Sequence, residues 1–126
     1  MPFVDITELE AIERKPGWHG RYFHSPHMTF AHYDFEQGSS IHTHFHPQEE
    51  VWQVIEGRLE VTVDGVMQVA GPGMAAIVLP NVPHSIRALT DGKAIVVDLC
   101  QYSRVTRLQC CNLLFEKRTQ RVNAIH

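Results

Sequence analysis

The sequence is poor in cysteine. Its three cysteines are Cys100, Cys110 and Cys111, and two of them are adjacent, so they do not form the disulfide framework that holds small secreted domains together. We interpret them as buried or incidental thiols without a chemical role. This cysteine content makes the reducing cytoplasm the expected compartment.

Long apolar runs and an excess of basic residues are also missing. No apolar run reaches the length of a membrane-spanning helix, and the first residues have neither a basic region nor a signal-peptide core. The formal net charge is -3, and no stripe of lysine and arginine accompanies it. The sequence therefore argues against a membrane protein and against nucleic acid as a main partner.

Internal repeats and low-complexity linkers are absent, so the 126 residues are expected to form a single domain that can bury a core. Short β-rich runs recur between turn signals, of which Asp64-Gly65 is the strongest because both residues favour a positive φ. These runs predict an all-β fold. They are residues 28–35, 50–55, 59–63, 66–69, 75–79, 85–88 and 94–100.

Histidine, in contrast, is abundant, with nine residues in the chain. If the strand continues unbroken to Pro47, the alternation of side chains puts His42, His44 and His46 on one face. A turn at Pro47 would then bring Glu50, at the start of the next strand, back beside the histidines.

His84, further along the chain, supplies a fourth potential ligand. Imidazole and carboxylate groups suit divalent transition metals, and three or four protein ligands leave a position for water or substrate. Histidines also cluster by chance, but the correctly spaced glutamate and the flanking glycines favour a metal site. We therefore predict that His44, His46, Glu50 and His84 bind one divalent ion, which we expect to be nickel, zinc, manganese or iron.

Five residues carry a resemblance to a known superfamily. Gly38, His44, His46, Glu50 and Gly57 match the first cupin motif, G-x5-H-x-H-x3-E-x6-G, at every spacing, so the chain resembles the cupins. The resemblance implies a small antiparallel jelly-roll β-barrel with the metal inside, formed by about residues 15–104.

The second cupin motif, G-x5-P-x-G-x2-H-x3-N, is matched only in part. Gly73 and His84 are in place, whereas Leu79, Asn81 and Ala88 stand at the positions of its proline, glycine and asparagine. Asparagine tolerates the positive φ that glycine provides in a turn, so Asn81 is compatible with the motif.

Within the superfamily, the chain is most similar to small single-domain cupins of pectin degradation, which linearise unsaturated uronates. The segments that carry this likeness are residues 15–17, 20–23, 27–29, 80–85, 88–90 and 97–98. In these relatives an aspartate, an aromatic residue and an arginine line the pocket, and Asp98, Cys100 and Arg104 stand at those positions. Cys100 therefore replaces the ring on which a substrate would stack.

This finer resemblance implies a metal-assisted ring opening or isomerisation of a sugar acid, and so a role in carbohydrate metabolism. Asp98 would act as general acid or base, and Arg104 would bind the substrate carboxylate. Two other functions stay open. Two histidines and a carboxylate also form the triad of iron dioxygenases, although a fourth ligand leaves fewer positions for oxygen and substrate. A barrel that binds a small ligand or a metal without catalysis would use the same fold.

Asp98 and the chain ends also leave alternatives open. A carboxylate in the apolar run 94–99 is paired with another group, exposed on an edge strand, or functional. Residues 5–14 fit a short helix or an edge strand, and residues 105–126 fit a short amphipathic helix, a frayed tail or a strand exchanged with another subunit. The exposed edges of such a barrel favour a homodimer.

Overall fold

The computed structural model describes residues 2–99, and this part of the chain is built almost entirely from strands. A short 3-10 helix, η1 (Ile6–Glu8), precedes ten strands. They are β1 (Ile12–Lys15), β2 (Trp18–His24), β3 (Met28–Phe35), β4 (Ser40–His44), β5 (Glu50–Glu56), β6 (Leu59–Val63), β7 (Val66–Ala70), β8 (Ala75–Val78), β9 (His84–Ala88) and β10 (Gly92–Leu99).

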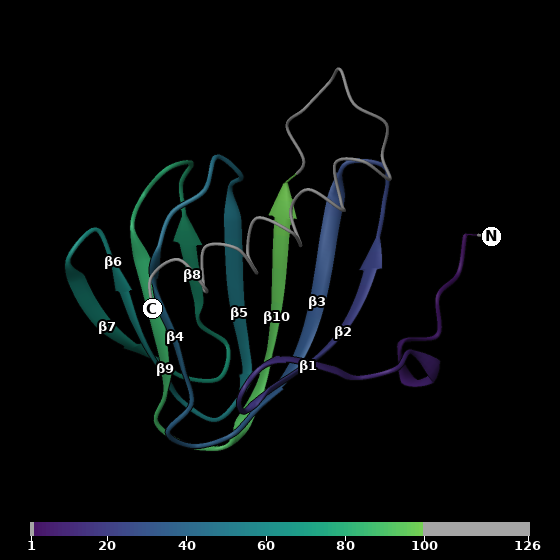
Figure 1. Cartoon of the computed structure of the whole chain (residues 1–126), viewed down its shortest axis with the longest axis horizontal. Coiled ribbons are helices and arrows are strands. Elements are labelled where there is room, and N and C mark those ends of the chain that lie inside the picture. The colour runs from purple at the N-terminus through teal and green to yellow at the C-terminus, as the bar shows by residue number, and fades with distance from the viewer. Residues whose placement is uncertain (1, 100–126) are drawn as a thin grey trace.

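The strands form two antiparallel sheets, which lie side by side in Figure 1. One sheet has six strands in the order β1-β2-β3-β10-β5-β8, and the other has four in the order β4-β9-β6-β7. The prediction of an all-β jelly roll is confirmed. Since β10 lies between β3 and β5, residues near position 98 come next to residues near position 50.

The core lies between the two sheets because successive strand residues face opposite sides. On β5, Glu50, Trp52 and Val54 are buried, while the residues between them are half-buried or exposed. The same alternation buries every second residue of β3, β9 and β10. A large apolar side chain buried in this way contributes about 1.5–3 kcal/mol relative to an exposed one.

Aromatic rings fill the part of the core next to β2, β3 and β5. Trp18 meets Tyr33 and Trp52 edge to face, with ring centroids 5.7 and 5.8 Å apart, and it packs against Phe35 at 5.5 Å. Tyr33 and Trp52 stack on each other at 5.8 Å. This packing is dense, and it holds the start of β5 in place.

The predicted strands agree closely with the structure. The runs 28–35 and 59–63 have the predicted bounds, and most of the others differ by one residue at an end. The predicted runs did not include β2, whose His19, Gly20 and Arg21 obscure its alternation. Of the alternatives for residues 5–14, the edge strand is found at the end of this segment as β1, while the helix is reduced to the single 3-10 turn η1.

Two turns have the backbone that their residues predict. Asp64 and Gly65 have φ values of 51° and 80° and join β6 to β7, which confirms the hairpin. Asn81 has a φ of 63°, so it takes the conformation usually given to glycine three residues before His84. Among residues 2–99, no helix has the length and hydrophobicity needed to cross a bilayer.

Candidate metal centre

His44 and His84 lie opposite each other on neighbouring strands of the four-stranded sheet. His44 ends β4, His84 begins β9, and the two residues are paired in antiparallel register. A β-bulge shifts the register of β4 between Ile41 and His44. Because the extra residue reverses the alternation, Ile41 and His44 both face inwards.

This bulge overturns one expectation from the sequence. An unbroken strand would place His42 on the same face as His44 and His46, but in the structure His42 is exposed. Its backbone carbonyl nevertheless contributes to the centre, since it lies 2.7 Å from Nδ1 of His44.

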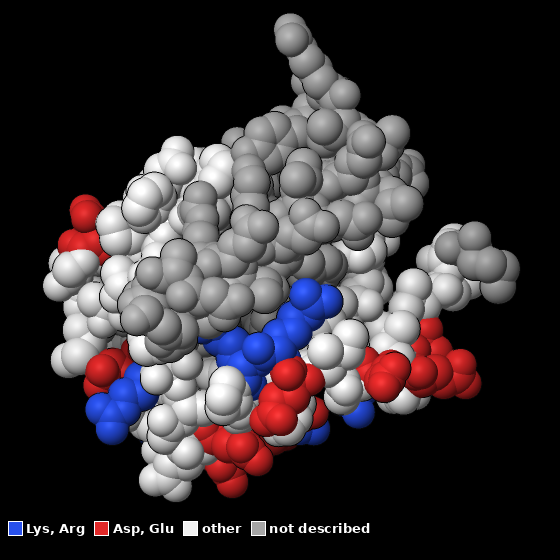
Figure 2. All heavy atoms as spheres, in the orientation of Figure 1, with Lys and Arg blue, Asp and Glu red and all other residues white. Residues whose placement is uncertain are grey.

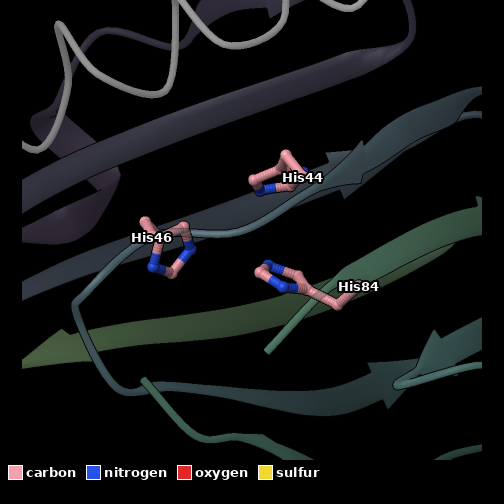
Figure 3. A group of neighbouring side chains, drawn as sticks. All are labelled: His44, His46 and His84. Atoms are coloured by element: carbon pink, nitrogen blue, oxygen red, sulfur yellow. The ribbon is translucent and has the colours of Figure 1, made fainter. Parts of the chain in front are cut away.

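His46, in the connection between β4 and β5, and Glu50, at the start of β5, approach the same point. Nε2 of His84 lies 3.1 Å from one carboxylate oxygen of Glu50, and Nε2 of His46 lies 3.7 Å from the other. The three imidazoles point toward a common space (Figure 3), with ring centroids 4.3 to 5.6 Å apart. The structure therefore brings together all four residues that the sequence singles out as ligands.

The hydrogen bonds of the three rings define their tautomers. Each Nδ1 lies close to a backbone carbonyl two residues away, at 2.7 Å for His44 and 2.9 Å for His46 and His84. A carbonyl oxygen only accepts, so Nδ1 of each neutral ring carries the proton and donates it. Nε2 is then unprotonated, and its lone pair is available to a metal.

In this arrangement the unprotonated Nε2 atoms and the Glu50 carboxylate, all hydrogen-bond acceptors, lie next to one another. Nε2 of His46 and of His84 are buried without a hydrogen-bond partner in the described residues, and both lie next to the carboxylate of Glu50. Lone pairs and a carboxylate at these distances repel one another unless a cation or a proton lies among them. Three imidazole nitrogens and one carboxylate are a donor set that fits a divalent transition metal.

The carboxylate of Glu50 is itself held in place. The indole N–H of Trp52 donates to its Oε2 atom at 2.9 Å, and both side chains are buried. Glu50 and Trp52 share a face of β5, which makes this contact possible. Such contacts to a ligand fix its orientation and support its affinity for the metal.

Asp98 belongs to the same cluster. It lies on β10, in the middle of the six-stranded sheet, and is 1% exposed, so the alternative of an exposed residue on an edge strand is wrong. It is paired with Glu50 across the strands, and ligand atoms of His46, Glu50 and Asp98 lie within 4.8 Å of one another. Two buried carboxylates this close need a cation or a shared proton.

Burial also affects the charge of His44. Removal from water is the largest effect, and it lowers the pKa of His44 to about 4, against a weaker opposing contribution from the His42 carbonyl. The ring therefore stays neutral, and able to bind a metal, at a pH where an exposed histidine is protonated.

Three further residues complete the comparison with the sequence. Arg104 and Cys100 lie outside the described residues, so the predicted contact of Arg104 with a substrate stays a prediction. Sequence reasoning missed Gln48, which is 1% exposed and whose carbonyl is the acceptor for His46. Its place two residues from both His46 and Glu50 was the available signal.

A second group of potential ligands lies at the surface. Nε2 of His19 is 3.6 Å from Glu13 and 3.7 Å from Glu36. These side chains are half-buried or exposed, so water can satisfy them, and the buried cluster is the better candidate. Elsewhere, the face seen in Figure 2 carries both acidic and basic side chains.

Comparison with known proteins assigns the chain to a family. Residues 31–100, more than half of the chain, match the cupin domain. No curated protein matches the sequence.

Solved structures with the same fold include other cupins. An RmlC-like cupin from Shewanella frigidimarina has a TM-score of 0.74 and 25% identity, with 79% of this chain and 90% of that chain covered. KdgF from a Halomonas species has a TM-score of 0.75 at 22% identity, with 82% and 96% covered. A salicylate 1,2-dioxygenase from Pseudoaminobacter salicylatoxidans has a TM-score of 0.63 at 21% identity, covering 67% of this chain but 27% of the dioxygenase.

At these identities, KdgF and the dioxygenase demonstrate a common fold. The family itself follows from the domain match, which includes the motif residues of the buried cluster. The chain therefore belongs to the cupin family, and it is a small cupin similar to KdgF.

Proposed function

We propose that this cupin is a metal-dependent enzyme that opens or isomerises a sugar acid of the uronate type. One observation carries the proposal: the buried His46 and His84 and the half-buried His44 have Nδ1 bonded to a carbonyl and present Nε2 to a common space beside Glu50. Water-exposed or structural histidines have no need of this arrangement.

His44, His46, Glu50 and His84 would hold the ion, as proposed from their spacing. When bound, a divalent ion supplies a Lewis acid that polarises a substrate oxygen and stabilises developing negative charge. Trp52 orients the carboxylate of Glu50, and the three carbonyls orient the imidazoles. The chain's own residues thus keep the centre ready for a ligand.

Asp98 is the residue proposed to move a proton. Its carboxylate is buried next to Glu50 and His46, where it can accept a proton from a substrate hydroxyl or carbon and return it elsewhere. Arg104, six residues further, would hold the substrate carboxylate by paired hydrogen bonds. The choice of a uronate as substrate is supported by the sequence likeness to the cupins of pectin degradation.

The variant Asp98→Asn tests this mechanism. The assay uses metal-reconstituted protein and an unsaturated uronate, and it measures turnover as the loss of ultraviolet absorbance. We expect turnover to fall by about 100- to 10,000-fold. Metal content should not change. Asp64→Asn is the matched control, because asparagine also tolerates the positive φ of that turn, and it should keep full activity.

Other results would change the assignment. Full activity of Asp98→Asn would remove Asp98 from the mechanism. Oxygen consumption with an aromatic acid, in place of uronate turnover, would identify the dioxygenase alternative. A tightly bound metal without any turnover would identify a binding protein.

A further inference from the structure

The side chain of Gln48 is buried, yet its amide has no hydrogen-bond partner among residues 2–99. The residue is 1% exposed, and neither Oε1 nor Nε2 finds a partner within the described part of the chain. An amide removed from water without compensation destabilises the folded state, so such groups are rare in natural proteins.

Gln48 lies on the inner side of the connection between β4 and β5. Burial alternates along this segment: His46, Gln48 and Glu50 are buried, Phe45 is exposed, and residues 47 and 49 are intermediate. Gln48 is therefore turned toward the interior of the protein, as are the two proposed ligands on either side of it. Its Cα atom is within about 7 Å of theirs, since each of them is two positions away along the chain.

The backbone around Gln48 is fixed on both sides. The carbonyl of Gln48 accepts the hydrogen bond of His46, and the carbonyl of Glu49 accepts one from the backbone N–H of Leu99, each at 2.9 Å. The unpaired amide therefore does not result from a loosely attached loop.

Buried polar atoms without a partner in residues 2–99 occur on two of the proposed ligands and on Gln48, and also on Trp18 in the aromatic core. Nε2 of His46 and Nε2 of His84 are buried without a hydrogen-bond partner in residues 2–99, as is the amide of Gln48. The histidine nitrogens are explained by a metal. The amide needs a partner of its own, and a ligand bound at the neighbouring site could supply it.

We propose that the side-chain amide of Gln48 binds the substrate. Its partner would be a substrate hydroxyl group next to the substrate oxygen that approaches the metal centre. A carboxamide both donates and accepts, and a hydroxyl group does the same, so the two are complementary. A carboxylate would leave Oε1 unpaired, and an unsubstituted aromatic ring would pair with neither atom. The inference rests on the proposed metal site and selects polyhydroxy acids over planar aromatic acids.

Folding has already removed the amide from water, so a ligand gains this hydrogen bond without a further desolvation cost. The same reasoning predicts opposite effects on stability and binding. Gln48→Met keeps the unbranched shape but removes the polar atoms, so it should stabilise the apo-protein while it weakens the complex.

The test compares wild type, Gln48→Met and Gln53→Met, whose glutamine is exposed on the outer face of β5. Metal content is measured first. Thermal unfolding of the apo-proteins and calorimetric titration of the metal-loaded proteins with galacturonate and with benzoate follow. We expect a higher unfolding temperature for Gln48→Met alone, about tenfold weaker galacturonate binding, and unchanged affinity for benzoate.

Each arm can overturn the inference. An unchanged or lower unfolding temperature of Gln48→Met would mean that water or protein already satisfies the amide. Equal galacturonate binding by wild type and Gln48→Met, or none by metal-loaded wild type, would remove the substrate role. Failure of wild type to bind metal would instead refute the proposed function. Thermal unfolding of the apo-proteins would still show whether the amide of Gln48 is buried without a partner.

Discussion

At the scale of single residues, the centre depends on groups that the sequence reveals to different degrees. His44, His46, Glu50 and His84 could be predicted because their spacing is a chemical pattern. The carbonyls that set the tautomers could not, since they come from the backbone path of a bulge and two turns. The contact between Trp52 and Glu50 also depends on side-chain rotamers, which the alternation of residues along a strand does not define.

That contact leads to a prediction about metal affinity. Trp52→Phe removes the N–H that holds Glu50, and we expect metal binding, measured by competition with a chromogenic chelator, to weaken about 10- to 100-fold. Trp18→Phe is the control, because Trp18 is equally buried but its indole nitrogen has no partner in residues 2–99. Equal losses in both variants would attribute the effect to core packing.

The lowered pKa of His44 predicts how stability depends on pH. A histidine with a pKa of 6.5 when unfolded and about 4 when folded takes up protons preferentially in the unfolded state. Its contribution to the free energy of unfolding is complete above pH 6.5 and is lost as the pH falls toward 4. Thermal unfolding of the apo-protein should show this decline, and His44→Ala should reduce its slope. An identical slope in the variant would contradict the assignment.

At the scale of the elements, the strands were predictable and their neighbours were not. Alternation identifies β3, β5 and β6 because each has one buried face. It does not reveal that β10 lies between β3 and β5, which is what buries Asp98 beside Glu50. Nor does alternation show the bulge in β4, because an extra residue leaves no mark in the composition.

Gly57 of the first motif acts at this scale, and Gly65 in the turn between β6 and β7 provides a comparison. Gly57 and Gly65 both have φ near 80°, but a Cβ atom at Gly57 would collide with the Asp91 carbonyl, whereas Gly65 has open space. We expect Gly65→Ala to lower the free energy of unfolding by about 1–2 kcal/mol. For Gly57→Ala we expect about 3 kcal/mol or more, because the collision adds to the strain. Equal values in urea titrations would show that the collision relaxes freely.

At the scale of the whole molecule, the cupin assignment accounts for the two sheets and for the buried polar cluster between them. The extent of a single domain over residues 1–126 stays a proposal, because the described structure ends at residue 99. The cytoplasmic location stays a proposal as well. Sequence could give the fold here because one motif combines glycine turns with ligands. It could not give the substrate, which depends on side chains from several distant strands.

A homodimer is the expected assembly. The edge strand β7 exposes Val66 and Met67 at 71% and 60%, and Ile77 on the edge strand β8 is 61% exposed. Apolar edges of this kind favour pairing with a second chain. Light scattering should give twice the chain mass of 14.4 kDa, whereas a value of 14.4 kDa would show a monomer.

The central claim, that the buried cluster binds a metal, is tested most directly by elemental analysis of protein purified without a metal-affinity tag. Wild type should contain about one equivalent of a divalent transition metal per chain, as should His19→Ala, which disrupts the surface group. The double variant His44→Ala, His46→Ala should contain none. Absence of metal from wild type even after reconstitution, or its loss in His19→Ala but not in the double variant, would contradict the account.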